Sequence, residues 1–308
     1  MTAVQTLPMP APKPPEGLVR GALPKRSRSR VLTIARTDLR QLAQSPDFWA
    51  PMLVLAAFFF VIVPTGLLLG ITHAGESPTL TKAAATLDLL PDGARATINK
   101  RVGGGNAAAG KAASAATRTS YALAVYLFAP LAVIVPMTIS TAVGANTLVG
   151  EREKGTGEWL AQTPASERDI YLGKLIASLL PGYATTLIGF GIYSLVVNTI
   201  VGPKVGGWFF PTRDWWILML WVVPPFLALT LTVVLRLSGR VKSAAAAQQA
   251  SGLVTLPLIL VSYAQSSGAL FGASNSGIIF GGVAWAGAIY GLARGQRAVR
   301  RAKLLGVD

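Results

Sequence analysis

Residues 51–71 read PMLVLAAFFFVIVPTGLLLGI, a run without one charged side chain. A helix needs about 20 apolar residues to cross the hydrocarbon core of a bilayer, so this stretch by itself predicts a membrane-spanning helix. The composition agrees, because 52% of the 308 residues are hydrophobic and 13% are charged, whereas an ordinary soluble domain carries about 25% charged residues. The sequence therefore predicts an all-α integral membrane protein.

Five further apolar stretches bring the number of predicted spans to six. The last two come from residues 243–293, which hold no charge. A single helix of that length would measure about 76 Å, against a hydrocarbon core of about 30 Å, so the stretch must turn. The polar segment QSSGALFGASNSG at 265–277 is the predicted break. The six predicted spans cover residues 51–71, 121–148, 175–201, 215–235, 244–263 and 277–293.

The basic residues predict which ends of the spans face the cytoplasm. Six spans place both termini on one side, and 20 of the 28 Lys and Arg residues fall on that side. Because cytoplasmic loops carry an excess of Lys and Arg, both termini are predicted to be cytoplasmic, with the protein in the cell inner or plasma membrane. The net charge of +15 then reflects contact with anionic lipid. No nucleic-acid-binding motif accompanies it.

The segments outside the spans complete the division of the chain. Leu32, Ala35, Leu39 and Leu42 recur at helical spacing, which predicts an amphipathic helix before the first span. That helix either lies on the membrane surface or is a solvated juxtamembrane helix. The predicted parts are a disordered cytoplasmic leader, an amphipathic interfacial helix, a six-helix transmembrane domain and a basic cytoplasmic tail: residues 1–27, 28–47, 48–293 and 294–308.

The segment 73–120 is predicted to lie outside the membrane, between the first two spans. It contains GNAAAGKA at 105–112, which matches the phosphate-binding pattern G-x-x-x-x-G-K except that Ala112 stands where Ser or Thr would hold magnesium. No hydrophobic strand precedes the pattern and ATP is absent outside the cell, so we do not expect nucleotide there. Residues 79–90 are predicted to form a short outer helix, packed on the membrane end or on a partner.

Prolines and glycines within the spans predict kinks and close helix contacts. A proline removes a backbone hydrogen bond and can kink its helix. Glycines four residues apart, such as Gly287 and Gly291, permit close approach of a neighbouring helix. The prolines in question are Pro64, Pro130, Pro136, Pro181, Pro224, Pro225 and Pro257.

The loop 150–174, GEREKGTGEWLAQTPASERDIYLGK, carries nine charges, while the predicted spans beside it carry none. Dense charge of both signs in a short inner loop is typical of a docking element for a soluble partner, because ion pairs position such a partner. The alternative is a solvated turn between two spans. Ser166 followed by Asp169 predicts the N-terminal cap of the third spanning helix.

This loop resembles the signature loop of ATP-binding cassette (ABC) exporter permeases of the second type. Those loops read like E-R-E-x-G-T-x-E-x-L, continue with a T-P or S-P step, a small residue and Ser, and end in G-K. Gly157 departs from the pattern, because a larger residue is usual there. The residues that the resemblance assigns to coupling with an ATPase are Glu151, Arg152, Glu153, Gly155, Thr156, Glu158, Trp159, Leu160, Thr163, Pro164, Ser166 and Lys174.

The resemblance implies a permease subunit with no ATPase of its own. A separate cytoplasmic ATPase dimer would bind ATP and magnesium, and the loop 150–174 would act as its coupling helix. Two permeases would work together, either as two copies or with a related chain. This chain itself is then expected to carry no catalytic residue, metal or cofactor.

Two other functions compete with that interpretation. An ion-coupled secondary transporter usually holds ionisable side chains inside the membrane, and the six predicted spans contain none; this argues against proton coupling but leaves sodium bound by backbone carbonyls open. A membrane enzyme would need convergent acids, bases or ligands. The outer acids are widely spaced, and the chain holds one histidine and no cysteine. The apolar, aromatic interior is compatible with export of a hydrophobic or amphiphilic substrate.

Overall fold

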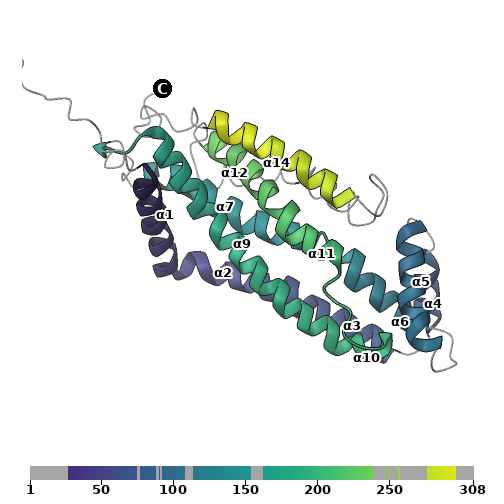
Figure 1. Ribbon diagram of the computed structural model, residues 1–308. Helices are drawn as coiled ribbons and strands as arrows, with labels where there is room; N and C mark the ends of the chain where they lie inside the picture. The colour runs from purple at the N-terminus through teal and green to yellow at the C-terminus, as the bar shows by residue number, and fades with distance from the viewer. Residues whose placement is uncertain are drawn as a thin grey trace, which may run out of the picture.

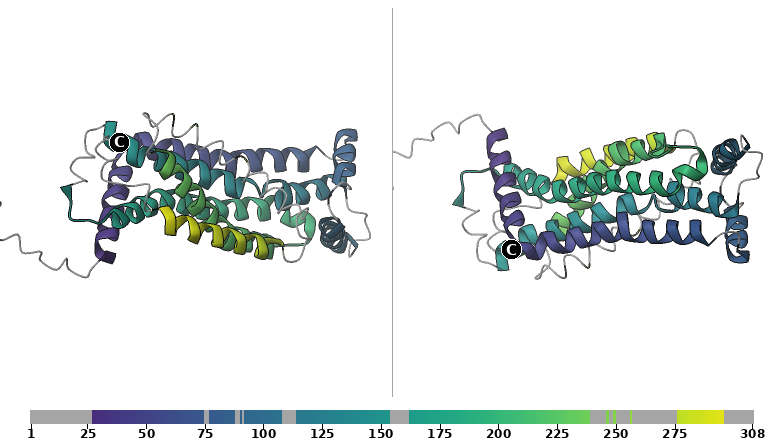
Figure 2. Two further views of the ribbon diagram at one scale, coloured as in Figure 1. Left: turned by 90° about the horizontal axis from the view of Figure 1, so that it is seen from above. Right: turned by 90° about the horizontal axis from the view of Figure 1, so that it is seen from below.

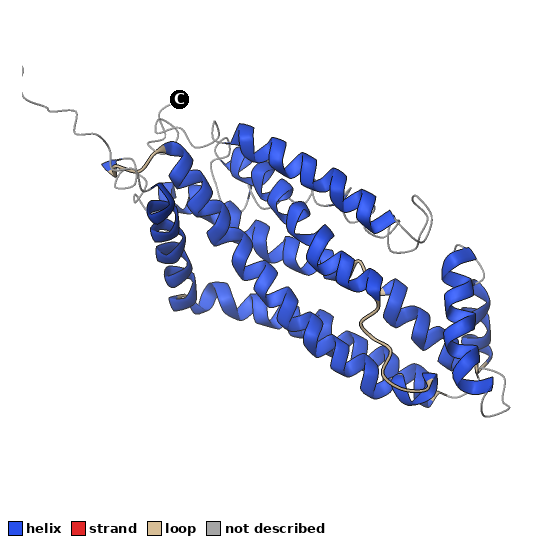
Figure 3. Cartoon of the chain, viewed as in Figure 1, coloured by secondary structure: helices blue, strands red, loops and turns tan. Residues whose placement is uncertain are grey.

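The computed structural model describes residues 27–74, 77–87, 90, 92–107, 114–153, 162–238, 246, 249, 256 and 276–295. Over these residues the chain is helical and contains no β-strand (Figures 1 and 3). An α-helix satisfies its own backbone hydrogen bonds, which is the condition for crossing a bilayer. The stretches long and apolar enough to cross a membrane are Pro46–His73, Ala115–Asn146, Glu167–Ile200, Arg213–Arg236 and Gly277–Arg294.

These five stretches correspond to five of the six predicted spans, with ends that differ by a few residues. The predicted span 244–263 lies outside the described residues, apart from 246, 249 and 256. The number six therefore stays a prediction. The five stretches are built in chain order from α2 (Pro46–Ala57), η1 (Phe58–Ile62) and α3 (Val63–His73); α6 (Ala115–Ala122), η3 (Leu123–Leu127) and α7 (Leu131–Glu153); α9 (Glu167–Ile200); α11 (Arg213–Ile217), η4 (Leu218–Val222) and α12 (Val223–Ser238); and α14 (Ser276–Gly295).

The segments labelled η are π-helical, and each precedes a proline by two or three residues. Pro64 follows η1, Pro130 follows η3 and Pro224 follows η4. A proline offers no N–H to the carbonyl four residues earlier and its ring clashes with that carbonyl, so the preceding turn widens. Pro136 and Pro181, in contrast, lie within regular α-helix. The predicted kinks thus coincide with a local change of helix type at only some of the prolines.

The break at Pro130 lies in the interior and is closed by two side chains from other helices. The N–H groups of Phe128 and Ala129 bond to the carbonyls of Leu123 and Tyr126, so the carbonyls of Ala124 and Val125 lose their usual helical partners. The hydroxyl of Tyr193 donates to the Ala124 carbonyl at 2.7 Å, and Nε1 of Trp215 donates to the Val125 carbonyl at 2.8 Å. Both donors are buried. The bundle therefore tolerates an interrupted helix without leaving these carbonyls unpaired.

Close helix crossings occur at glycines. α7 and α9 cross at Gly182, where an added Cβ would lie 2.7 Å from the Pro136 carbonyl oxygen and against the hydroxyl of Ser140. α14 approaches α12 at Gly291, where an added Cβ would lie 3.3 Å from the Thr232 side chain. The glycine pattern of the last span therefore predicted a close contact correctly at Gly291.

Short helices lie across both ends of the long bundle. At one end, α1 (Ser27–Gln44) runs across the long helices and not along them (Figure 2); we call this the α1 end. At the opposite end stand α4 (Pro78–Thr86), α5 (Asp92–Ala107) and α10 (Gly202–Val205) (Figure 1); we call this the α5 end. The predicted outer helix 79–90 corresponds to α4, which buries Leu80 and Ala84.

Candidate functional site

The described ends of the loop 150–174, which are the end of α7 and the residues from 162 to the start of α9, lie at the α1 end (Figure 1). Glu151, Arg152 and Glu153 form the end of α7. Thr163 and Pro164 precede α9, Ser166 is its N-terminal cap, and Lys174 lies within it. The other predicted coupling residues lie outside the described residues: Gly155, Thr156, Glu158, Trp159 and Leu160.

A capping box fixes the point at which the loop enters α9. The hydroxyl of Ser166 accepts the N–H of Asp169 at 3.1 Å, and the Asp169 carboxylate accepts the N–H of Ser166 at 3.2 Å. These two bonds satisfy groups that a helix start otherwise leaves unpaired, and such a cap typically contributes about 1 kcal/mol. The cap predicted from Ser166 and Asp169 is therefore confirmed, and it fixes the residue at which the loop ends and α9 begins.

Helix α1 packs against the first turns of α9 through one stripe of its surface. Val31, Ala35 and Asp38 turn inward, with Ile34 half-buried beside them. These positions follow the i, i+3, i+4, i+7 spacing of one helix face. At Gly173 the two helices meet so closely that an added Cβ would lie 2.7 Å from Cγ2 of Ile34 and 3.2 Å from the Val31 carbonyl oxygen.

The stripe that packs on α9 differs from the predicted apolar face of this helix. Leu32 was expected on that face with Ala35, yet its side chain is 63% exposed. The difference arises because Gly173 of α9 leaves room for Val31 and Ile34. The face of α1 that carries these two residues therefore packs on α9, and Leu32 points away from it. Whether α1 lies on a membrane surface stays a prediction.

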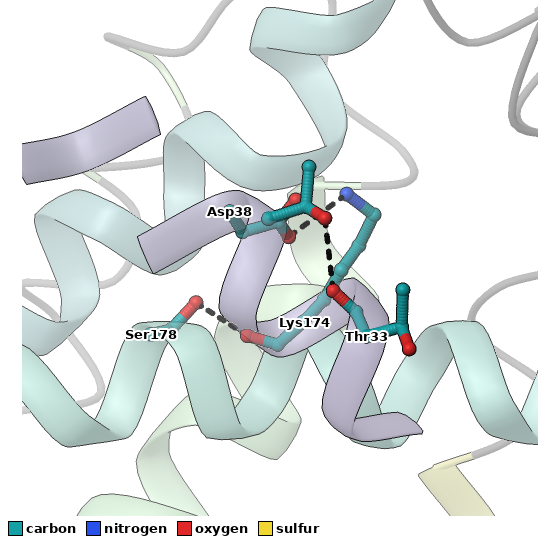
Figure 4. Close-up of polar contacts among 5 residues, drawn as sticks. Thr33, Asp38, Lys174 and Ser178 are labelled. Carbon is teal, nitrogen blue, oxygen red and sulfur yellow. Dashed lines mark hydrogen bonds and ion pairs between the residues drawn. The ribbon is translucent and has the colours of Figure 1, made fainter. Parts of the chain in front are cut away.

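Lys174 and Asp38 form an ion pair between α9 and α1 (Figure 4). Lys174 Nζ lies 3.6 Å from Asp38 Oδ2, and the side chains are 1% and 16% exposed. At this distance the contact is electrostatic and longer than a hydrogen bond. Burial raises the pKa of Asp38, and the neighbouring ammonium of Lys174 lowers it in part. The pair ties the last residue of the predicted coupling set to α1 and withdraws it from the surface.

A second polar contact joins α1 to the loop on the other side of the cap. The guanidinium of Arg30 donates to the carbonyl oxygen of Pro164 at 3.0 Å. Arg30 and Asp38 therefore hold the segment 164–174 at two points, with the capping box between them. Within the described chain, α1 and the start of α9 form one packed unit.

Sequence reasoning missed Asp38 and Arg30 as members of this site. One signal was present, because Asp38 is the only acidic residue between positions 28 and 46. A single acid on an otherwise basic helix indicates a basic partner elsewhere in the fold. The sequence did not show that this partner is Lys174, because Lys174 lies on a helix far away in the chain. Among the described residues, no three His, Asp or Glu side chains gather in a way that would hold a metal ion.

Comparison with known families identifies a match over most of the bundle. The model of the family described as ABC-2 family transporter protein matches residues 105–287, which is more than half of the chain. The matched range includes the loop 150–174 and excludes α1. No curated protein matches the chain.

Proposed function

Because the chain belongs to the ABC-2 family of transporter proteins, we propose that it is the permease subunit of an ATP-driven exporter whose ATPase is a separate cytoplasmic chain. Family membership and the apolar helices make it a multi-pass membrane transport subunit. Under the proposal the ATP and magnesium bind to the partner ATPase dimer, and this chain supplies the membrane path and the coupling helix.

The attachment of α1 to the loop is the observation that carries the coupling proposal. A force applied to the loop passes into α9 through the Ser166 cap, and into α1 through Arg30 and Asp38. A solvated turn would not need two contacts to a separate helix. We assign the direct contacts with the ATPase to Glu153, Glu158 and Trp159, and a positioning role to Lys174.

Charge distribution supports the orientation that coupling requires. The α1 end would face the cytoplasm together with both termini, because 20 of the 28 basic residues belong to that side in a six-span chain. The α5 end would then lie on the outer, non-cytoplasmic side of the inner or plasma membrane. A second permease, identical or related, would complete the transporter, and a hydrophobic or amphiphilic molecule would be exported.

Co-purification from the native host tests the proposal. The chain is tagged, extracted in mild detergent and examined for a bound ATPase and for ATP hydrolysis. We expect a soluble ATPase in near-equal amount, and we expect the triple replacement of Glu153, Glu158 and Trp159 by Ala to release it. The matched control replaces an exposed acid and an exposed tryptophan of the α5 end, Asp92 and Trp208, by Ala, and should retain the ATPase.

Either of two outcomes would contradict the proposal. A chain that purifies alone and transports without ATP would support the ion-coupled alternative. An ATPase that stays bound to the triple variant, or that is lost equally from the control variant, would contradict the assignment of the ATPase contacts to the loop.

A further inference from the structure

Helix α1 has a second, outward face that the contact with α9 leaves uncovered. Leu32, Arg36 and Arg40 follow one another at four-residue spacing along this face, and all three are exposed. Neither Arg36 nor Arg40 has an ion-pair partner among the described residues. The only acid of the helix, Asp38, is turned toward Lys174. The outward face therefore presents two guanidinium groups beside one large apolar side chain, with no carboxylate of α1 among them.

The position of α1 brings this face to the edge of the membrane-spanning region. α1 ends at Gln44 and the first spanning stretch begins at Pro46. Trp49, in the first turn of that stretch, is 42% exposed, and tryptophan favours the level of the lipid head groups. Because α1 runs across the end of the bundle (Figure 2), its length lies near this level and not deeper in the hydrocarbon core.

We propose that the face formed by Leu32, Arg36 and Arg40 binds the head groups of anionic phospholipids. A guanidinium forms paired hydrogen bonds with phosphate oxygens, and the apolar side chain of Leu32 beside the two arginines enters the boundary with the acyl chains. A basic residue near an anionic membrane surface strengthens binding by about fivefold. The lipid, and not a soluble protein, is the occupant that fits a basic face beside an interfacial tryptophan.

This contact gives lipid composition an influence on the loop. The same helix holds Pro164 through Arg30 and Lys174 through Asp38. Lipid bound to the outward face opposes movement of α1, and so it also fixes the segment 164–174. The lipid contact stands on the structure of α1 alone; its effect on ATPase coupling rests on the proposed function.

Hydrogen–deuterium exchange of the full-length protein in vesicles tests the lipid contact without ATP or a partner. The vesicles contain phosphatidylcholine alone or phosphatidylcholine with about 30% phosphatidylglycerol. We expect amide exchange in residues 30–44 to slow by about fivefold or more with phosphatidylglycerol, and this protection to weaken in high salt. Inorganic phosphate added to phosphatidylcholine vesicles should give no protection, which separates a lipid head group from a free anion.

Charge-removing variants assign the effect to the proposed face. The variant Arg36→Gln/Arg40→Gln should exchange at the same rate in both kinds of vesicle. The matched control Lys82→Gln/Lys100→Gln removes two exposed basic side chains from the α5 end and should keep the protection of α1. Equal exchange of the unmodified protein in both vesicles, or protection that survives in the arginine variant, would overturn the proposal. Neither result would bear on whether an ATPase co-purifies.

Discussion

At the scale of single residues, the ion pair between Lys174 and Asp38 explains how a full charge is tolerated at 1% exposure. Removing an ion from water is costly, and a buried charge therefore needs a partner of opposite sign. Asp38 keeps some contact with solvent, so the desolvation cost of the pair is lower than that of an ion pair enclosed on all sides. Its value lies in position, because it fixes which face of α1 meets α9.

Replacing Lys174 by Met should destabilise the protein. The methionine keeps most of the volume but leaves the Asp38 carboxylate without its counter-charge, at a cost of about 1–3 kcal/mol. The second replacement, Asp38→Asn, should recover part of that loss in the double variant. Thermal unfolding of the detergent-solubilised protein measures the four members of this cycle. Strictly additive effects of the two replacements would show that the pair is not coupled.

The pKa of Asp38 predicts how the contact between α1 and α9 responds to pH. Burial raises the pKa of Asp38 above its ordinary value of 3.8, so the docked carboxyl binds a proton more readily than the undocked one. Docking is therefore favoured at low pH, and it weakens as the pH rises from the ordinary value through the raised one. Amide exchange in α1, corrected for its intrinsic pH dependence, should increase over that window.

The control for this pH dependence is Asp38→Asn, which removes the titrating group. Exchange in its α1 should show no step in the same window. A step of opposite sign in the unmodified protein would mean that attraction to Lys174 outweighs burial and lowers the pKa instead.

At the scale of helices, two glycines of α9 differ in what surrounds them. Gly173 touches α1, whereas an added Cβ at Gly191 would meet no atom within 4 Å. Gly173 has no side chain, and this is the reason that α1 can lie so near to α9. The second position has only the usual disadvantage of glycine in a helix, which is greater backbone freedom in the unfolded chain.

The replacements Gly173→Ala and Gly191→Ala should therefore have opposite effects. At Gly191 the added methyl group should stabilise the helix by about 0.5–1 kcal/mol. At Gly173 it should displace Ile34 and Val31, lower the melting temperature and speed amide exchange in α1. Similar melting temperatures and similar α1 exchange in the two variants would show that the close contact at Gly173 has no energetic weight.

The helices also show where sequence reasoning succeeds and where it stops. Five spans were predictable because apolar length is a local property, and so was the cap of α9, whose two residues are three positions apart. The packing face of α1 was not, because the glycine that selects it lies on another helix. Similarly, the prolines signalled kinks, but the sequence did not reveal that Tyr193 and Trp215 would bond to the carbonyls near Pro130.

At the scale of the whole molecule, the two ends of the bundle are built differently. Among the described helices, α1 lies across the entry to α9 at the α1 end, whereas α4 and α5 at the α5 end each pack against α6 (Figures 1 and 2). For the candidate site, the sequence located the loop 150–174 but not the helix that braces it, because that helix lies far away in the chain. The proposed orientation places the α1 end in the cytoplasm.

Thiol labelling measures this orientation directly, because the chain contains no cysteine. The variants Gln41→Cys on α1 and Lys100→Cys on α5 place single thiols at exposed positions of opposite ends. In intact cells, a membrane-impermeant reagent should label the thiol at position 100 and should reach position 41 only after permeabilisation. The reverse pattern would invert the predicted topology, and labelling of both in intact cells would contradict a spanning arrangement.

The crossing of α7 and α9 at Gly182 has a mechanical consequence. Gly182 lies close to the midpoint of α9, which runs from Glu167 to Ile200, so arms of about 23–27 Å extend to either side of the contact. A rod that tilts about its midpoint moves its two tips by similar distances in opposite directions. α9 is in this respect a balanced lever, with its fulcrum at a residue that has no side chain. If α9 tilted about this contact, a displacement of the loop tip would appear at the far tip in the opposite direction and at nearly the same size.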